Sequence, residues 1–425
     1  MYQMLFFVAL ALVGCSKEQE PYVLKQADIK IENAEKGISA KVAQTLKVSV
    51  ISASDENVSY QWFIDGKQVS QTKNLEYIFD MAGVYDLLLK VTQSSLTYQY
   101  KESVNVTFDA ELKPTEGATA YITKVLDYMP AIGQFTNKMP LYEKGDTQEA
   151  MNKKVLASIG NNKKGMITLG GYGGYVVVGF DHTIKNVVGK RDFRVIANAF
   201  YSASNPDSNA PEGGSCEPGI IMVAYDINKN GLPDNNEWYE IAGSSHIDPT
   251  KELWYEKAKK AGNNVNTYFD YQITYHRPAE EPSTQEGWAK YIKWEDNKGN
   301  SGYKVKNAFH NQPYYPLWAS ANTLTFTGTC LPQNGIDESG EGNYYVLYKF
   351  IFGYADNETN NKDESAIDID WAINKKGQKV SLPGVDFIKV YTGVNQENGW
   401  LGECSTEITS IEDLHVLGTS IDTRK

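Results

Sequence analysis

The feature that most constrains the fold of this chain is a series of short segments in which apolar and polar residues alternate. Alternation places apolar side chains on one face of an extended strand, whereas a helix needs a period of about 3.6 residues. Clusters of Gly, Asn, Asp and Pro separate the segments and predict turns. The alternating segments are 47–50, 60–64, 77–91, 174–180, 192–198, 220–225, 323–328, 344–350 and 387–391. The sequence therefore predicts a mainly β protein.

Composition divides the chain into five parts, because about 410 residues beyond a leader exceed one comfortable core. We expect a signal peptide, a tether, an Ig-like sandwich, a linker and a larger jelly-roll-like β-sandwich with long loops. Helical spacing at 148–159 and at 252–261 predicts one or two short helices in the larger domain. The predicted boundaries are 1–14, 15–24, 25–108, 109–117 and 118–425.

The start of the chain predicts export and lipid attachment. Residues 5–13 are apolar, too few for a bilayer span of about 20 residues but enough for the apolar core of a signal peptide. Leu12-Val13-Gly14-Cys15 resembles a bacterial lipobox, so Cys15 is the predicted lipidation site. The segment before the run lacks Lys and Arg, and an ordinary signal peptide with an incidental cysteine is the alternative. We expect a surface-exposed outer-membrane protein attached to the membrane only through this lipid.

Charge and cysteine content narrow the classes of partner. The net charge of -12 argues against nucleic acid and anionic lipid surfaces, which both select basic proteins. Cys216, Cys330 and Cys404 remain after Cys15, and their spacing matches no zinc site. One disulfide with one buried thiol, or three buried thiols, are both open.

The sharpest motif for a bound ion is the segment 226–237. Oxygen-bearing side chains occupy its first, third, fifth, ninth and twelfth positions, with glycine at the sixth, as in an EF-hand calcium loop. Both flanks look like strands, so we expect a structural Ca2+ site between strands, with a metal-free hairpin as the alternative. The predicted ligands are Asp226, Asn228, Asn230, the carbonyl of Leu232, Asp234 and Glu237.

A second acidic segment, 356–364, precedes Asp368 and Asp370, which lie on an expected strand. The segment is a weaker metal candidate, and its carboxylates could serve a glycoside hydrolase. The chain contains no Gly-x-Ser-x-Gly, His-Glu-x-x-His or phosphate-loop motif. We therefore assign no catalytic residue and expect a protein that is not an enzyme.

Aromatic residues concentrate in the segment 309–318. Its two prolines exclude a regular helix or a central strand, so these rings are expected on a loop. Aromatic faces beside amide side chains suit a sugar or a flat macrocycle, although packing over a sheet edge is the alternative. The predicted ligand-binding residues are His310, Tyr314, Tyr315 and Trp318.

The order Tyr60-Gln61-Trp62, Asp65-Gly66 and then a patterned run from Phe79 to Val91, with Gly83 within it, resembles the PKD domain, an Ig-like sandwich. The resemblance implies that Trp62 packs between two sheets and that the domain acts as a spacer.

Phrases across 127–415 resemble a family of Bacteroidetes cell-surface lipoproteins in which a PKD-like domain commonly precedes the larger unit. They are 127–135, 170–182, 217–220, 353–357, 386–395 and 399–403. Some members resemble lipoproteins encoded beside TonB-dependent receptors, including those of cobalamin-uptake loci, which is an analogy and not an argument from a site. The family's loop usually has one residue fewer before its Glu-Trp pair, so the assignment of Glu237 departs from the pattern.

These observations favour a lipid-anchored protein that captures an extracellular ligand, a small molecule such as a cobalamin or a glycan, for a TonB-dependent uptake system. A structural or adhesive surface protein is the first alternative. A calcium-dependent hydrolase using the carboxylates of 356–370 is the second.

Overall fold

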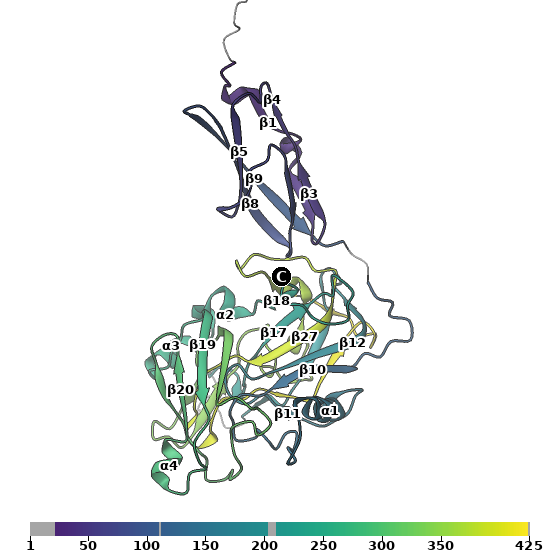
Figure 1. Ribbon diagram of the computed structural model, residues 1–425. Coiled ribbons are helices and arrows are strands. Elements are labelled where there is room, and N and C mark those ends of the chain that lie inside the picture. The colour runs from purple at the N-terminus through teal and green to yellow at the C-terminus, as the bar shows by residue number, and fades with distance from the viewer. Residues whose placement is uncertain (1–21, 110–111, 203–209, 424–425) are drawn as a thin grey trace, which may run out of the picture. The chain divides into compact units, whose positions relative to one another are not determined.

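The computed structural model describes residues 22–109, 112–202 and 210–423, and the chain forms two compact units (Figure 1). The predicted signal peptide and Cys15 lie outside the described residues. The first unit comprises the described residues of 1–40, 44–79 and 84–105, and the second those of 41–43, 80–83 and 106–425.

The first unit is built from antiparallel strands. Its largest sheet has the order β2-β9-β8-β5-β6, and the pairs β1-β4 and β3-β7 form two further sheets. The strands are β1 (Ile29–Ile31), β2 (Ile38–Lys41), β3 (Thr45–Val48), β4 (Val50–Ser52), β5 (Val58–Ile64), β6 (Lys67–Ser70), β7 (Leu75–Ile78), β8 (Gly83–Gln93) and β9 (Leu96–Thr107).

Trp62 on β5 organises the core of this unit, as the sequence predicts. Its side chain is fully buried, and its indole Nε1 donates to the carbonyl of Thr72 at 3.1 Å. The turn after β5 is formed by Asp65 and Gly66, which both have positive φ angles, 48° and 79°. Two successive residues with positive φ make the tight hairpin turn that joins β5 to β6.

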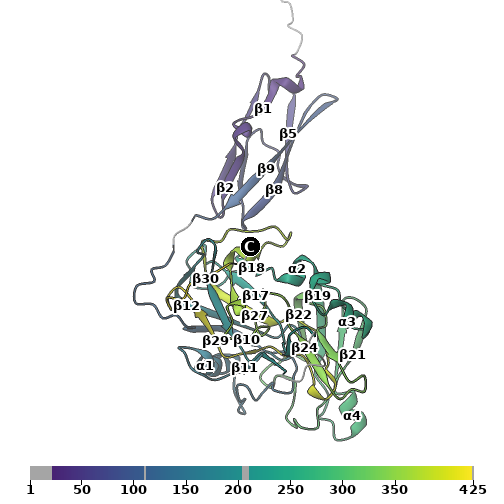
Figure 2. The same cartoon turned by 180° about the vertical axis from the view of Figure 1, so that it is seen from behind.

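A six-stranded antiparallel sheet runs through the second unit, in the order β10-β12-β27-β17-β18-β26 (Figures 1 and 2). β27 pairs with β12 on one side and with β17 on the other, and its residues are almost all buried. The strands are β10 (Lys124–Met129), β12 (Tyr175–Lys185), β27 (Gly384–Thr392), β17 (Gly219–Ala224), β18 (Trp238–Ile241) and β26 (Ala372–Ile373).

Five smaller sheets surround this central sheet. Their orders are β21-β20-β19-β22, β15-β16-β24-β23, β25-β14-β29, β11-β28 and β13-β30. The first two contain β19 (Tyr268–His276), β20 (Ile292–Asp296), β21 (Ser301–Lys304), β22 (Thr323–Cys330), β15 (Phe200–Tyr201), β16 (Gly213–Ser215), β23 (Gly335–Asp337) and β24 (Tyr345–Tyr348). The others contain β14 (Phe193–Ile196), β25 (Ala366–Ile367), β29 (Ser410–Asp413), β11 (Ile167–Thr168), β28 (Glu407–Ile408), β13 (Lys190–Arg191) and β30 (Ile421–Asp422).

Four α-helices occur in the described residues, more than the one or two expected. They are α1 (Gln148–Ile159), α2 (Ser244–Ile247), α3 (Tyr255–Lys260) and α4 (Gln285–Ala289). α1 matches its prediction at both ends: Thr147 caps the first turn by accepting from the backbone N–H of Ala150, and Gly160 follows the last residue. α2 and α4 have four and five residues, which is too short for a helical period to show in sequence.

The mainly β prediction is confirmed, and each alternating segment of the second unit contains a strand. Cys216, Cys330 and Cys404 are three buried free thiols, the second of the two arrangements left open. Within the described ranges, no helix is both long and apolar enough to cross a membrane.

Candidate functional site

A pocket of about 380 Å³ in the second unit gathers side chains from segments far apart in sequence. We call it the carboxylate pocket. Its lining includes Phe135, Asn198, Ser215, Glu217, Phe309, His310, Asn398, Trp400, Glu403, Ser405 and Glu407. Acidic, amide and hydroxyl groups therefore share one cavity with aromatic rings, and no Lys or Arg is among its lining residues.

Two of the lining acids, Glu217 and Glu407, form a cluster with a third carboxylate, that of the buried Asp356. Glu217, Asp356 and Glu407 each place an oxygen within 4.8 Å of the other two, and the described ranges contain no other such group of acidic, His or Cys side chains. Backbone pairing brings them together: the N–H of Glu217 donates to the carbonyl of Asp356 at 2.9 Å, and Glu407 begins β28. Glu217 is partly buried, whereas Asp356 and Glu407 are 3% and 4% exposed.

Hydrogen bonds orient each of these carboxylates. The two oxygens of Asp356 accept from the backbone N–H groups of Glu407 and Asn198, at 2.9 and 3.2 Å. Glu217 accepts from the backbone N–H of Ser405 at 3.0 Å and from the hydroxyl of Ser215 at 3.1 Å. The carboxylate of Glu407 accepts from the hydroxyls of Thr168, at 3.0 Å, and Ser405. The three acids are therefore held in place before any ligand arrives.

The electrostatics of the pocket are unusual. Burial raises the pKa of Glu217 and Asp356 well above the usual range, and the charge of Glu407 raises both further. Burial also raises the pKa of Glu407. The pKa of Glu403 is raised to about 8, first by burial and then by the charge of Glu397. Among the described residues, no Lys, Arg or His forms an ion pair with Glu217, Asp356 or Glu407. The pocket therefore favours protons, a cation or a hydrogen-bonding ligand at its carboxylates.

Aromatic rings form the mouth of the pocket. Phe309 and Trp400 are 78% and 56% exposed, which is high for large apolar side chains. The ring of His310 packs edge-on against Phe135 with centroids 4.8 Å apart. The side chain of Asn307 donates to the carbonyl of Trp400 at 2.7 Å and so joins the two loops. The pocket lining thus combines solvent-exposed aromatic rings with polar side chains.

Of the four predicted ligand-binding residues, only His310 lines this pocket. Tyr314 and Tyr315 are 1% and 2% exposed, which favours the alternative that their rings serve packing over their prediction as ligand-binding residues. Tyr314 packs against Tyr291, and the hydroxyl of Tyr315 donates to the carbonyl of Ala321 at 3.0 Å. The segment is a loop, as predicted, but the rings of Tyr314 and Tyr315 turn inward and join a core cluster with residues of β19 and β22.

Trp318 is partly buried and serves packing in the second unit. Its ring stacks on Tyr128 and Tyr142, with centroids 5.9 and 6.2 Å away, and its Nε1 donates to Gln148 at 3.0 Å. These contacts favour the alternative that this ring packs over a sheet edge.

The segment 226–237 joins β17 to β18, between strands as expected. The oxygens of Asp226 accept from the backbone N–H groups of Asn230 and Gly231, at 3.1 and 2.9 Å, and those of Glu237 from Ile227 and Asp234, at 2.8 and 2.9 Å. Gly231 has a φ of 78°, which a side chain rarely adopts.

A lysine faces this loop. The ammonium of Lys113 lies 3.4 Å from Asp226 and 3.1 Å from Asp386, so a cation of the protein already neutralises this carboxylate. Calcium bound by Asn228, Asn230, Leu232 and Asp234 together with Asp226 and Glu237 stays a prediction.

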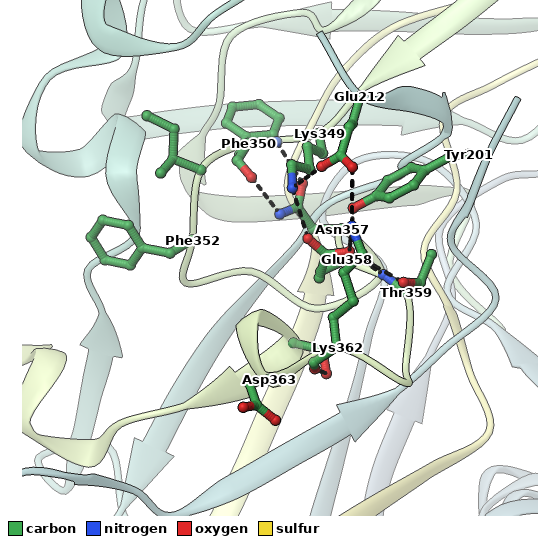
Figure 3. Close-up of polar contacts among 12 residues, drawn as sticks. Tyr201, Glu212, Lys349, Phe350, Phe352, Asn357, Glu358, Thr359, Lys362 and Asp363 are labelled. Atoms are coloured by element: carbon green, nitrogen blue, oxygen red, sulfur yellow. Dashed lines mark hydrogen bonds and ion pairs between the residues drawn. The ribbon is translucent and has the colours of Figure 1, made fainter. Parts of the chain in front are cut away.

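The second acidic segment is used mainly for structure (Figure 3). Glu358 forms ion pairs with Lys349 at 2.9 Å and Lys362 at 3.8 Å, and it accepts from the hydroxyl of Tyr201. Lys349 also pairs with Glu212 at 2.5 Å. The first residue of the segment, Asp356, is the exception, because it clusters with Glu217 and Glu407.

Asp368 and Asp370 do not lie on the expected strand. Asp368 caps a 3-10 turn, Ile369–Trp371, by accepting from the backbone N–H of Asp370 at 2.8 Å. Asp370 accepts from the side chain of Asn186 at 2.8 Å. Both carboxylates hold loops, and neither lines the carboxylate pocket.

A larger pocket, of about 670 Å³, lies beside β18, β22 and β26. Met222, Trp238, Phe269 and Ile373 give it a mostly apolar wall. Its acid, Glu240, is partly buried and already pairs with His246 at 2.6 Å and with the hydroxyl of Thr329 at 2.6 Å. This cavity has apolar surface but no acid without a partner, so the carboxylate pocket is the better candidate site.

Sequence reasoning missed most of the carboxylate pocket. Phe309 and Trp400 lie in segments noted for aromatic content or family resemblance, and Asp356 opens the acidic segment. Glu217 opens a segment, 217–220, that was noted only for family resemblance, and Glu407 carries no local signal because it is a single acid at the start of a two-residue strand.

No protein family and no curated protein matches this chain. Among solved structures, a quinoprotein alcohol dehydrogenase-like protein from Bacteroides thetaiotaomicron is 14% identical, with a TM-score of 0.16, over 22% of this chain and 20% of its own. A SusE-like protein is 10% identical with a TM-score of 0.15, over 92% of this chain and 98% of its own.

A third structure is SGBP-B of a mixed-linkage glucan utilization locus from Bacteroides ovatus, solved with a mixed-linkage heptasaccharide. It is 12% identical, with a TM-score of 0.17, over 83% of this chain and 94% of its own. At such TM-scores these similarities carry no argument about fold or function, and the chain spans only a fifth of the first of these proteins.

Proposed function

We propose that this protein is a non-enzymatic cell-surface protein that binds an extracellular ligand in the carboxylate pocket, and that the ligand is a glycan. One observation carries the proposal: the exposed rings of Phe309 and Trp400 line the same pocket as acidic and amide side chains. A sugar ring has an apolar face of C–H groups and a polar edge of hydroxyls. Aromatic rings suit the face, and carboxylate, amide and hydroxyl groups suit the edge.

The size of the pocket favours a glycan over a cobalamin. Small-molecule pockets span about 300–1,000 Å³, and at about 380 Å³ this one is near the lower limit. A sugar ring fits such a volume, whereas a corrin macrocycle would enter only by an edge. A cobalamin is therefore the second ligand to test.

The wider proposal joins this site to the rest of the chain. A lipid at Cys15 would tether the protein to the outer membrane, and the first unit would act as a spacer. A TonB-dependent receptor is the proposed partner that would take the ligand onward, and a structural Ca2+ at 226–237 would brace the second unit.

Calorimetry of the purified protein against a panel of glycans and cobalamins tests the proposal. Trp400→Ala and Phe309→Ala should each weaken the binding of a glycan about tenfold, the equivalent of about 1.4 kcal/mol, because each removes one stacking face. Tyr303→Ala is the matched control, since Tyr303 is 45% exposed on β21 and lies outside the pocket lining.

Binding that both pocket variants leave unchanged would contradict the assignment of the site. Release of new reducing ends from a glycan, lost in Glu407→Gln, would instead identify the carboxylates as catalytic and make the protein a hydrolase.

A further inference from the structure

One face of the six-stranded sheet carries a row of side chains that crosses every strand. Residues that pair directly across antiparallel strands point to the same side of a sheet. Lys389 on β27 pairs with Val177 on β12 and with Met222 on β17, and β27 lies between these two strands (Figure 1). From β10 to β26 the complete row is Asp127, Val177, Lys389, Met222, Glu240 and Ile373. A lysine therefore stands near the middle of this face.

Two cavities open on this face. The cavity of about 670 Å³ beside β18, β22 and β26, which we call the apolar pocket, is lined by Met222 and Glu240 of the row. A second cavity, of about 370 Å³, is lined by Lys389 and Val177, and we call it the lysine pocket. Trp238 lines both cavities. They are therefore neighbours that share a tryptophan wall, and packing leaves part of the sheet face open.

The ammonium of Lys389 lacks a counter-charge. Among the described residues it forms no ion pair and no hydrogen bond, and it lies over the ring of Tyr175, 4.3 Å from the ring centre. Tyr175 also lines the lysine pocket, and the ammonium is not among the polar atoms that are sealed from solvent. Asp127 is the acid whose charge acts on this lysine, but its carboxylate already accepts from the Tyr175 hydroxyl at 2.6 Å. The ammonium is therefore accessible from the pocket and open to an anion.

This lack of a partner sets Lys389 apart from the other lysines of the second unit. Buried charges in proteins are normally paired. Every other described lysine of this unit that is at least partly buried forms an ion pair with an acid, as Lys304 does with Glu397 at 2.8 Å and Lys349 with Glu358 at 2.9 Å. Burial lowers the pKa of Lys389, which shows that its charged form is less well solvated than that of an exposed lysine. A bound anion would supply the partner that the fold does not.

The walls around this lysine are mainly apolar. Leu126, Leu232 and Pro233 line the lysine pocket. Phe269 and Ile373 line the apolar pocket, in addition to the shared tryptophan. Ligand pockets commonly combine apolar walls with a few polar groups that fix the orientation of the ligand. A single cation beside apolar walls suits a ligand with one anionic group and an apolar body.

The remaining charged groups of the two cavities also favour an anion. The acid of the lysine pocket, Asp127, is held by a tyrosine hydroxyl, and the acid of the apolar pocket, Glu240, is paired with His246. Lys375 and Lys376 line the apolar pocket and are exposed, so they add positive charge at its edge. An anionic ligand therefore meets positive charge in both cavities and no acid that lacks a partner.

We propose that the two cavities form one binding site for an amphiphilic carboxylate. Lys389 binds the carboxylate in the lysine pocket, and the apolar chain of the ligand passes Trp238 into the apolar pocket, where it contacts Met222 and Phe269. The loop 226–237 contributes residues to both cavities and so borders the whole site. None of these residues lines the carboxylate pocket, so this site does not rest on the proposed function.

Calorimetry of the full protein with octanoate and with octan-1-ol tests the site, because the two probes have chains of equal length and differ in charge. We expect the wild type to bind octanoate about tenfold more tightly than octan-1-ol. Lys389→Met removes the charge and keeps most of the length of the side chain, so octanoate binding should weaken about tenfold while octan-1-ol binding stays the same. Phe269→Ala, at a residue that is 59% exposed, should weaken the binding of both probes equally.

Lys124→Met is the matched control, since Lys124 is exposed on β10 of the same sheet and lines neither cavity. It should leave the binding of both probes unchanged. The site is overturned if the wild type does not bind octanoate, or if octanoate binds equally to the wild type and to Lys389→Met. An equal loss in Lys124→Met would show a general effect of net charge and would also contradict the site. If Lys389→Met does not fold, Lys389→Gln replaces it, and the ratio of the two affinities decides in the same way.

Discussion

Two acidic regions of the second unit look alike in composition and differ in how their charge is held. In the loop 226–237 the carboxylates of Asp226 and Glu237 accept from backbone N–H groups of the same loop, and Lys113 lies 3.4 Å from Asp226. In the carboxylate pocket the acids come from segments far apart in sequence, and no basic side chain of the described ranges pairs with them. A contiguous loop can neutralise its acids with its own backbone, whereas acids assembled by tertiary packing have only what the fold places beside them.

The largest expected effect tests whether the loop depends on its acids for stability. Asp226→Ala removes a fully buried side chain that accepts from Asn230 and Gly231 and pairs with Lys113, so we expect a loss of about 3–5 kcal/mol in the free energy of unfolding. Urea denaturation measures it. Asn228→Ala, at an exposed position of the loop, should cost less than about 1 kcal/mol. Equal losses in the two variants would show that burial at Asp226 does not matter.

The next effect concerns the pocket and depends on pH. Glu403 has a pKa of about 8 in the folded protein, raised from 4.5 by burial first and then by Glu397. Between these values the folded state holds a proton that the unfolded state releases, so stability falls as pH rises through this window and the loss is complete above pH 8. Each pH unit costs about 1.4 kcal/mol, or close to 3 kcal/mol between pH 5 and pH 7.

Glu403→Gln removes this proton while its side-chain oxygen can still accept from the backbone N–H of Gln134. The free energy of unfolding of the variant should therefore exceed that of the wild type progressively from pH 5 to pH 8. Chemical denaturation at several pH values measures the difference. Parallel pH profiles for the two proteins would mean that Glu403 ionises normally in the pocket.

The smallest effect isolates the backbone of the loop from its charge. A Cβ atom added at Gly231 would have no atom within 4 Å, so Gly231→Ala is unfavourable only because of the φ of 78°. We expect it to lower the free energy of unfolding by about 1–2 kcal/mol. Gly231→Asn should cost less, because asparagine tolerates this conformation better than alanine. Thermal unfolding compares the two. If both substitutions are neutral, the loop can form without the glycine turn.

The sequence predicts local features of this protein well. Alternation along β5 places Trp62 in the core, and the Asp65-Gly66 turn follows from backbone preferences of these two residues. The spacing of 148–159 predicts α1 together with its end at Gly160. Each of these features depends on neighbours within about ten residues.

The local sequence does not predict which way the side chains of a loop point. Prolines at 313 and 316 predict that the segment 309–318 is irregular, and it is. Whether a ring on such a loop faces solvent depends on what packs beneath it: Phe309 points outward, whereas Tyr314 and Tyr315 fill the core beside β19. No periodicity in the loop distinguishes these rings.

By itself, the sequence determined the β class, the hairpin at Asp65-Gly66, helix α1 and the strand-flanked loop 226–237, because short-range backbone and apolar patterns control all of them. Only the tertiary structure decided that Glu217 and Glu407 line one pocket with Trp400 and cluster with the buried Asp356. The physical reason is that pairing between distant strands and loops brings these side chains together. The local sequence around a single acid is the same whether its side chain faces water or two other buried acids.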